Sequence, residues 1–216
     1  MSLGPIGTGE ETPPRPAQFN ARRNDPGRAH WFSIAGWQSI ERLTPAYAHL
    51  MSPRPAPEPI APGQESVWDY PRPPAIRASD EEIIVILGGV QICETRTSWR
   101  ILETSHPPTY YLPGSAFIEG SLRPAKGSSF CEWKGQASYL DVIGGGKIAP
   151  RAAWYYPHPN APYSVLVDHV ALYAGAMDSC VVDGERVVPQ PGGFYGGWIT
   201  SNISGPFKGG PGTLGW

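Results

Sequence analysis

The chain has only three cysteines in 216 residues: Cys93, Cys131 and Cys180. They lie far apart, and no two of them form the Cys-x-x-Cys pair on which many structural zinc sites are built. An odd number of isolated cysteines also argues against a disulfide framework. We therefore expect free thiols, and the sequence predicts no metal ion and no cofactor.

Long apolar runs and an excess of charge of one sign are also absent. No apolar run reaches the roughly 18 residues that a membrane-spanning helix needs, and the N-terminus lacks the apolar segment of a signal peptide. The net charge is -2, and charged residues make up 17% of the chain. Such a balance does not predict a surface for nucleic acid or an anionic membrane. Together these absences predict a cytoplasmic protein that binds neither.

Proline and glycine, in contrast, are abundant, with 26 residues each. More than half of the prolines precede residue 75, and glycine is most concentrated after residue 185. The ends of the chain therefore differ from its middle. We predict three parts: a Pro-rich arm at 1–74, a β core at 75–185 and a Gly- and aromatic-rich tail at 186–216.

The arm and the tail both carry apolar side chains that need a partner. Apolar residues recur at spacings of three and four from Trp31 to Tyr47, which predicts a short amphipathic helix near 31–50. That helix packs either on the main domain or on a second subunit. The tail holds aromatic residues among its glycines, which favours a tail lying along a groove, with aromatics as anchors and glycines that allow close backbone approach.

The middle of the chain contains short strands separated by turn residues. Turns are predicted at Gly88-Gly89 and at Gly144 to Gly146, and short helical turns near 113–117 and 162–167. Such spacing, with almost no helical periodicity, indicates an all-β fold. The predicted strands are Glu82–Leu87, Val90–Thr95, Trp99–Thr104, Thr109–Leu112, Ile118–Leu122, Ser129–Trp133, Ala137–Ile143, Ala152–Tyr156, Val170–Tyr173 and Ser179–Val182.

One stretch, residues 102–113, concentrates groups that can do chemistry. It reads Leu-Glu-Thr-Ser-His-Pro-Pro-Thr-Tyr-Tyr-Leu-Pro. The double proline after His106 holds the preceding backbone extended. Tyr110 and Tyr111 follow on a strand, so their side chains point to opposite faces. We predict that this stretch forms the floor and one wall of a pocket.

Three residues are candidates for catalysis: Glu103, His106 and Lys134. A buried Glu103 needs a cationic partner, and Lys134 is the expected one, either in a structural ion pair or as part of an acid–base or ligand-carboxylate site. For His106 the roles of base, metal ligand and turn residue stay open. Cys131 and His106 form the only plausible cysteine–histidine couple.

The candidate ligand-binding residues are aromatic. Aromatic side chains on strands either pack in the core or line a concave face, where they suit a planar or cationic ligand. Both interpretations stay open for this set, which consists of Tyr110, Tyr111, Tyr139, Trp154 and Tyr156.

Six segments of the core match a known family in the family's order, over about half of the chain: Gly88–Thr95, Leu102–Pro113, Cys131–Tyr139, Ala153–Pro157, Val170–Tyr173 and Asp183–Glu185. Through them the core resembles the family called domain of unknown function 427. The resemblance implies a β-tent (Mss4-like) fold, in which small antiparallel sheets meet at an angle over a hydrophobic seam. Several relatives of that fold bind zinc through paired Cys-x-x-Cys, which this chain lacks.

The family also has a nucleotidyltransferase-like label, which the residues do not favour. That chemistry needs clustered metal-binding carboxylates and a phosphate cradle. The chain has no Asp-x-Asp, Asp80-Glu81-Glu82 is typical of a solvated charge cluster, and Gly144 to Gly146 is not followed by Lys-Ser/Thr.

Two hypotheses stay open. The first is a pocket in the β core for an unidentified small molecule, with or without catalysis. The second is a non-catalytic interaction protein, whose arm and tail hold a homo-oligomer or a larger assembly.

Overall fold

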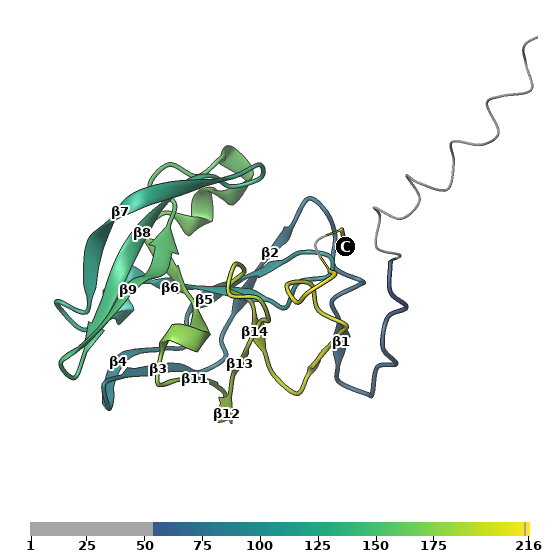
Figure 1. Ribbon diagram of the computed structural model, residues 1–216, viewed down its shortest axis with the longest axis horizontal. Helices are drawn as coiled ribbons and strands as arrows, with labels where there is room; N and C mark the ends of the chain where they lie inside the picture. The colour runs from purple at the N-terminus through teal and green to yellow at the C-terminus, as the bar shows by residue number, and fades with distance from the viewer. Residues whose placement is uncertain (1–53, 214) are drawn as a thin grey trace, which may run out of the picture. The chain divides into compact units, whose positions relative to one another are not determined.

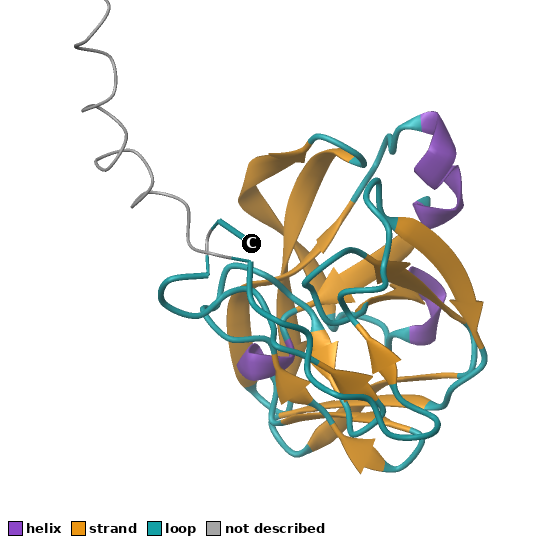
Figure 2. Cartoon of the chain, turned by 90° about the vertical axis from the view of Figure 1, so that its right-hand side faces the viewer, coloured by secondary structure: helices purple, strands orange, loops and turns teal. Residues whose placement is uncertain are grey.

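The computed structural model describes residues 54–213 and 215–216. The predicted helix near 31–50 lies outside these residues. Strands dominate the described part, and its helices are three short turns, η1 (Gly114–Ala116), η2 (Ala161–Leu166) and η3 (Ala174–Ala176) (Figure 2). No helix in the described part is long and apolar enough to cross a membrane. The all-β prediction is confirmed, and the β-tent assignment stays a prediction.

Two antiparallel sheets form the body of the described chain (Figure 1). The larger sheet contains, from edge to edge, β2 (Ala75–Ser79), β5 (Ser98–Leu102), β6 (Thr109–Pro113), β10 (His169–Leu172), β9 (Lys147–Tyr155), β8 (Gly135–Gly144) and β7 (Leu122–Cys131). The smaller contains β12 (Glu185–Arg186), β11 (Ser179–Val182), β3 (Ile83–Leu87) and β4 (Val90–Thr95).

Most predicted strands match observed ones within a few residues, but the strand predicted at Ile118–Leu122 is wrong. Residues 118–121 form a turn instead, in which the backbone N–H and the hydroxyl of Ser121 both donate to the carbonyl of Ile118, at 3.1 and 2.7 Å. Strand β7 begins only at Leu122. An apolar residue at the start of a segment was therefore not enough to define a strand.

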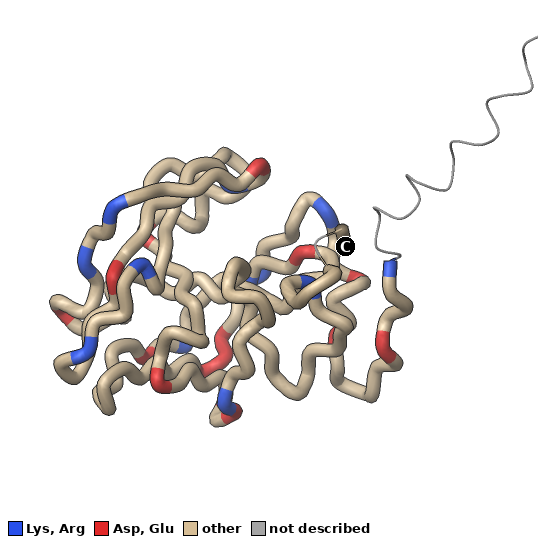
Figure 3. The backbone as a smooth tube through the Cα atoms, in the orientation of Figure 1, with Lys and Arg blue, Asp and Glu red and all other residues tan. Residues whose placement is uncertain are grey.

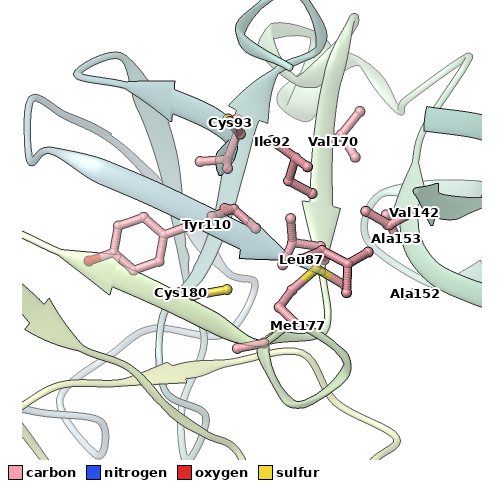
Figure 4. Packing of buried hydrophobic residues seen from close by; sticks show 14 of the residues in the cluster. Leu87, Ile92, Cys93, Tyr110, Val142, Ala152, Ala153, Val170, Met177 and Cys180 are labelled. Atoms are coloured by element: carbon pink, nitrogen blue, oxygen red, sulfur yellow. The ribbon is translucent and has the colours of Figure 1, made fainter. Parts of the chain in front are cut away.

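A hydrophobic seam joins the two sheets. Along β3, residues 83, 85 and 87 are buried and residues 84 and 86 are half-buried. Because side chains alternate along a strand, the three buried ones point into the seam. Leu87, Ile92 from β4, Tyr110 from β6 and Val142 from β8 belong to one buried cluster there (Figure 4). Complete burial of one such aliphatic side chain stabilises the fold by about 1.5–3 kcal/mol.

The C-terminal tail forms two short strand pairs, one within itself and one with the segment before the core. Strand β14 (Trp198–Ile199) pairs with β13 (Val188–Pro189), and β15 (Ile203–Ser204) lies parallel to β1 (Glu65–Ser66). Trp198 is only 1% exposed, and its indole N–H donates to the carbonyl of Leu172 at 3.2 Å. The tail is therefore part of the packed structure.

Charged side chains are distributed over the described backbone with both signs interspersed (Figure 3). Arg123 on β7 pairs with Asp141 on β8 at 2.9 Å, and Lys147 on β9 pairs with Asp178 at 2.7 Å. Both cations are more than half exposed, so these pairs add little to stability. The seam, and not surface charge, holds the sheets together.

Two glycine turns touch at the seam's edge. The β3–β4 turn contains Gly88, and the β8–β9 turn contains Gly145 and Gly146. A Cβ atom added to Gly145 would lie 1.9 Å from the carbonyl oxygen of Gly88, whereas one added to Gly146 would meet nothing within 4 Å. The close approach of the two sheets at this point therefore requires glycine.

We predict that Gly145→Ala lowers the free energy of unfolding by about 1–3 kcal/mol more than Gly146→Ala. Both glycines have positive φ, 52° and 78°, so both variants carry backbone strain, but only Gly145→Ala adds a clash with backbone. Urea unfolding of the two variants measures the difference. Equal losses in the free energy of unfolding would show that the close contact between the two turns does not require glycine at position 145.

Candidate functional site

A cavity of about 600 Å³ lies on the face of the seven-stranded sheet that points away from the seam. Alternation along the strands separates the two faces. On β9, Ala153 faces the seam and Trp154 the cavity, and on β6 Tyr110 faces the seam and Tyr111 the cavity. The same sheet thus supports a core on one side and a candidate site on the other.

The structure brings seven of the eight candidate residues together around this cavity. The exception is Tyr110, which is 2% exposed, packs on Trp198 with ring centroids 5.2 Å apart and donates its hydroxyl to Glu81 at 2.9 Å. Its position follows from strand alternation. The seven that line the cavity are Glu103, His106, Tyr111, Lys134, Tyr139, Trp154 and Tyr156.

The ion-pair partner of Glu103 is Arg72, and the expected pairing with Lys134 is wrong. A guanidinium nitrogen of Arg72 lies 3.0 Å from a carboxylate oxygen of Glu103. The hydroxyl of Thr104 donates to the carbonyl of Tyr70 at 2.6 Å, which fixes the segment before the core alongside the end of β5 and places Arg72 next to Glu103. Lys134 is held in the β7–β8 turn instead.

His106 sits in a tight turn that sets the state of its ring. Its backbone N–H donates to the carbonyl of Glu103 at 3.0 Å, and its Nδ1 lies 2.9 Å from the carbonyl of Thr104. Because a carbonyl only accepts, Nδ1 carries the proton, and in the neutral ring Nε2 is an acceptor. Burial lowers the pKa of His106, and the hydrogen bond to Thr104 opposes that shift. The ring is therefore neutral at pH 7.

The aromatic residues of the cavity form a connected wall. The indole N–H of Trp154 donates to the hydroxyl of Tyr111 at 3.2 Å, and the two rings meet edge to face at 6.4 Å. Trp154 also packs on Tyr173 with centroids 4.7 Å apart, and Tyr111 on Tyr156 at 6.3 Å. Burial raises the pKa of both the Tyr111 and Tyr156 hydroxyls, so both are neutral at physiological pH.

The tail contributes residues to the cavity that were not among the sequence candidates. Tyr195 lies edge-on to His106 with centroids 4.6 Å apart. A Cβ atom at Gly196 would lie 2.1 Å from the Trp154 ring, so the tail backbone runs directly against the indole. Aromatics placed between glycines at 192–198 were the signal for this packing, but alone they did not show which part of the core the tail meets.

Buried Gln190 holds this part of the tail in place. Its side-chain oxygen accepts from the N–H of Gly197 at 3.0 Å, and its amide donates to the carbonyl of Lys208 at 2.7 Å. The segment it fixes, residues 193–196, also borders a second cavity of about 500 Å³. Tyr139, Tyr173 and Tyr195 line both cavities, so the tail segment lies between them.

Cys131 and His106 both line the first cavity, but no hydrogen bond joins them in residues 54–213. The charges that act on His106 come from Glu103, Lys208 and Arg72. Across the same residues, no three His, Cys, Asp or Glu side chains are grouped so that they could hold a metal ion.

Comparison with known protein families matches residues 75–183 to the domain of unknown function (DUF427). The comparison with curated proteins gave no match. The matched region includes Glu103, His106 and Lys134, while Arg72 and the tail residues of the cavity lie outside it. Because the match covers half of the chain and confirms the resemblance seen in the sequence, the protein belongs to the DUF427 family.

Proposed function

We propose that the cavity binds a flat, aromatic small molecule, which inserts against the wall of aromatic side chains. The observation that carries the proposal is the lining itself. The volume of the cavity, about 600 Å³, falls within the range of roughly 300–1,000 Å³ that is typical of ligand sites. Nine aromatic side chains line it: Tyr111, Phe130, Trp133, Tyr139, Trp154, Tyr156, Tyr173, Phe194 and Tyr195.

This lining favours a flat ligand over a branched aliphatic one. Aromatic rings attract one another in offset or edge-to-face arrangements, beyond the effect of the area they bury. Phe130 and Phe194 are 78% and 76% exposed, so two large apolar rings at the cavity remain open to solvent. A flat ligand would cover apolar surface that the protein alone leaves in contact with water.

A group of polar residues gives the proposed ligand an orientation. Glu103 is held by Arg72, and neutral His106 offers one ring nitrogen as a proton acceptor. A carboxylate next to a neutral imidazole can accept hydrogen bonds from a ligand N–H or O–H. In this proposal Glu103 and His106 bind the polar edge of the ligand, and His106 is the residue able to accept a proton from it.

Assembly through the arm and the tail has no comparable observation in its favour within the described residues. Two aromatic residues of the tail pack on their own chain. Trp198 is buried in the seam, and Trp216 packs on Trp68 with centroids 5.9 Å apart. We therefore propose that the tail forms part of the wall of the ligand site.

We predict that 2-naphthol binds the protein and that its saturated analogue, decahydro-2-naphthol, binds about fivefold more weakly or worse. Each aromatic pair contributes about 0.5–1.5 kcal/mol that a saturated ring cannot provide. Isothermal titration with the full chain measures both affinities. Equal affinities, or no binding of either compound, would contradict the proposal.

A pair of glycine variants locates the binding site. Gly196→Ala should weaken 2-naphthol binding, because the new methyl group overlaps the Trp154 ring and displaces the tail. Gly210→Ala is the matched control in the same tail, since its methyl group would lie 3.9 Å from the nearest side chain, that of Pro191. An equal loss of 2-naphthol affinity in both variants would show that the ligand binds elsewhere.

We predict that His106 in the folded protein has a pKa below the ordinary value of about 6.5, as followed by NMR and assigned with His106→Gln. The neutral ring then contributes stability that is complete above about pH 6.5 and is lost as the pH falls from there towards the folded-state pKa. Below pH 6.5 the free energy of unfolding should therefore fall more for the wild type than for His106→Gln. A pKa of 6.5 or higher would contradict the lowering of the His106 pKa by burial.

A further inference from the structure

Lys134 is a largely buried residue that lines the cavity and is only 8% exposed. Within residues 54–213, its ammonium group takes part in no hydrogen bond and no ion pair, and it lies 5.9 Å from the centroid of the Tyr156 ring. The ammonium nitrogen is not among the fully buried unpaired atoms of these residues, so it keeps contact with solvent. It can therefore bind an anion that enters the cavity.

The turn that carries Lys134 is held by hydrogen bonds from Asn160, a residue outside the turn. Asn160 donates its backbone N–H to the carbonyl of Lys134 at 3.0 Å and its side-chain amide to the carbonyl of Trp133 at 2.8 Å. Gly135 follows with a φ of 97°, a conformation that favours glycine. The backbone of the turn is therefore ordered before any ligand binds, which reduces the entropy cost of using Lys134 in binding.

The other cations of the cavity already have partners. Arg72 pairs with Glu103 at 3.0 Å, and the ammonium group of Lys208 donates to the carbonyl of Trp216 at 2.7 Å. Glu132, in the same turn as Lys134, lines the cavity too, but it is an exposed residue and forms no ion pair with Lys134. Lys134 is thus the cavity cation left available among the described residues.

We propose that Lys134 is the anion-binding residue of the cavity, and that the ligand is a flat aromatic compound bearing a carboxylate or a phosphate. The inference rests on the proposed function, which supplies the flat ring. An ammonium group binds either anion as a compact positive charge, and such charge-assisted hydrogen bonds are about twice as strong as neutral ones. The aromatic wall holds the ring while Lys134 binds the acidic group.

The test compares flat probes with and without an anionic group, using the full chain and isothermal titration. 2-Naphthoate is paired with 2-naphthamide, and 2-naphthyl phosphate with 2-naphthol. We expect at least one anion to bind about tenfold more tightly than its neutral partner. A larger preference for 2-naphthoate over its neutral partner assigns the acidic group as a carboxylate, and a larger preference for 2-naphthyl phosphate assigns it as a phosphate.

Variants then assign the preference to Lys134. Lys134→Met should remove the preference for the anion and leave the affinity for the neutral probe within about twofold, whereas Lys134→Arg should keep part of it. Lys126→Met is the matched control, because it removes the same charge from an exposed position on β7 outside the cavity lining. A preference that survives Lys134→Met would overturn the inference.

The outcomes for the two proposals are distinct. Equal wild-type affinities for the acid and its neutral partner would overturn the anion site but leave the binding of flat ligands intact. Failure of every flat probe to bind would overturn both proposals. The comparison within the wild type needs no variant, so equal affinities would overturn the inference even if Lys134→Met does not fold.

Discussion

The site depends on one constraint, the alternation of side chains along the strands of the larger sheet. On β6, Tyr110 enters the seam between the sheets and the next residue, Tyr111, enters the cavity. A shift of β6 by one residue would exchange the two and disrupt the core and the aromatic wall together. The register that stabilises the fold therefore also fixes the site.

Segments far apart in the chain complete what the sheet begins. Ser105 joins two of them, because its N–H donates to the carbonyl of Val67 at 3.0 Å and its own carbonyl accepts from the N–H of Lys208 at 2.9 Å. The segment before the core supplies Arg72, and the tail supplies Tyr195, which lies edge-on to His106. The family's matched region thus supplies most of the cavity, including Lys134, and the flanking segments complete it.

The local parts of this structure were predictable and the distant contacts were not. Turn residues and apolar alternation predicted most strands, and the opposite directions of Tyr110 and Tyr111 followed from strand geometry alone. The partner of Glu103 could not be predicted, because Arg72 reaches it only through packing of a segment 31 residues earlier in the chain. For the same reason the contact of Gly196 with Trp154 was missed, although the glycine-rich pattern of the tail was noted.

The central claim is that one cavity combines an aromatic wall with a cation available for binding. A crystal structure of the protein soaked with 2-naphthoate tests it most directly. The account predicts the naphthalene ring against Trp154 and Tyr111, with its carboxylate hydrogen-bonded to Lys134. A ring bound outside the cavity, or a carboxylate that points away from Lys134 into solvent, would contradict it.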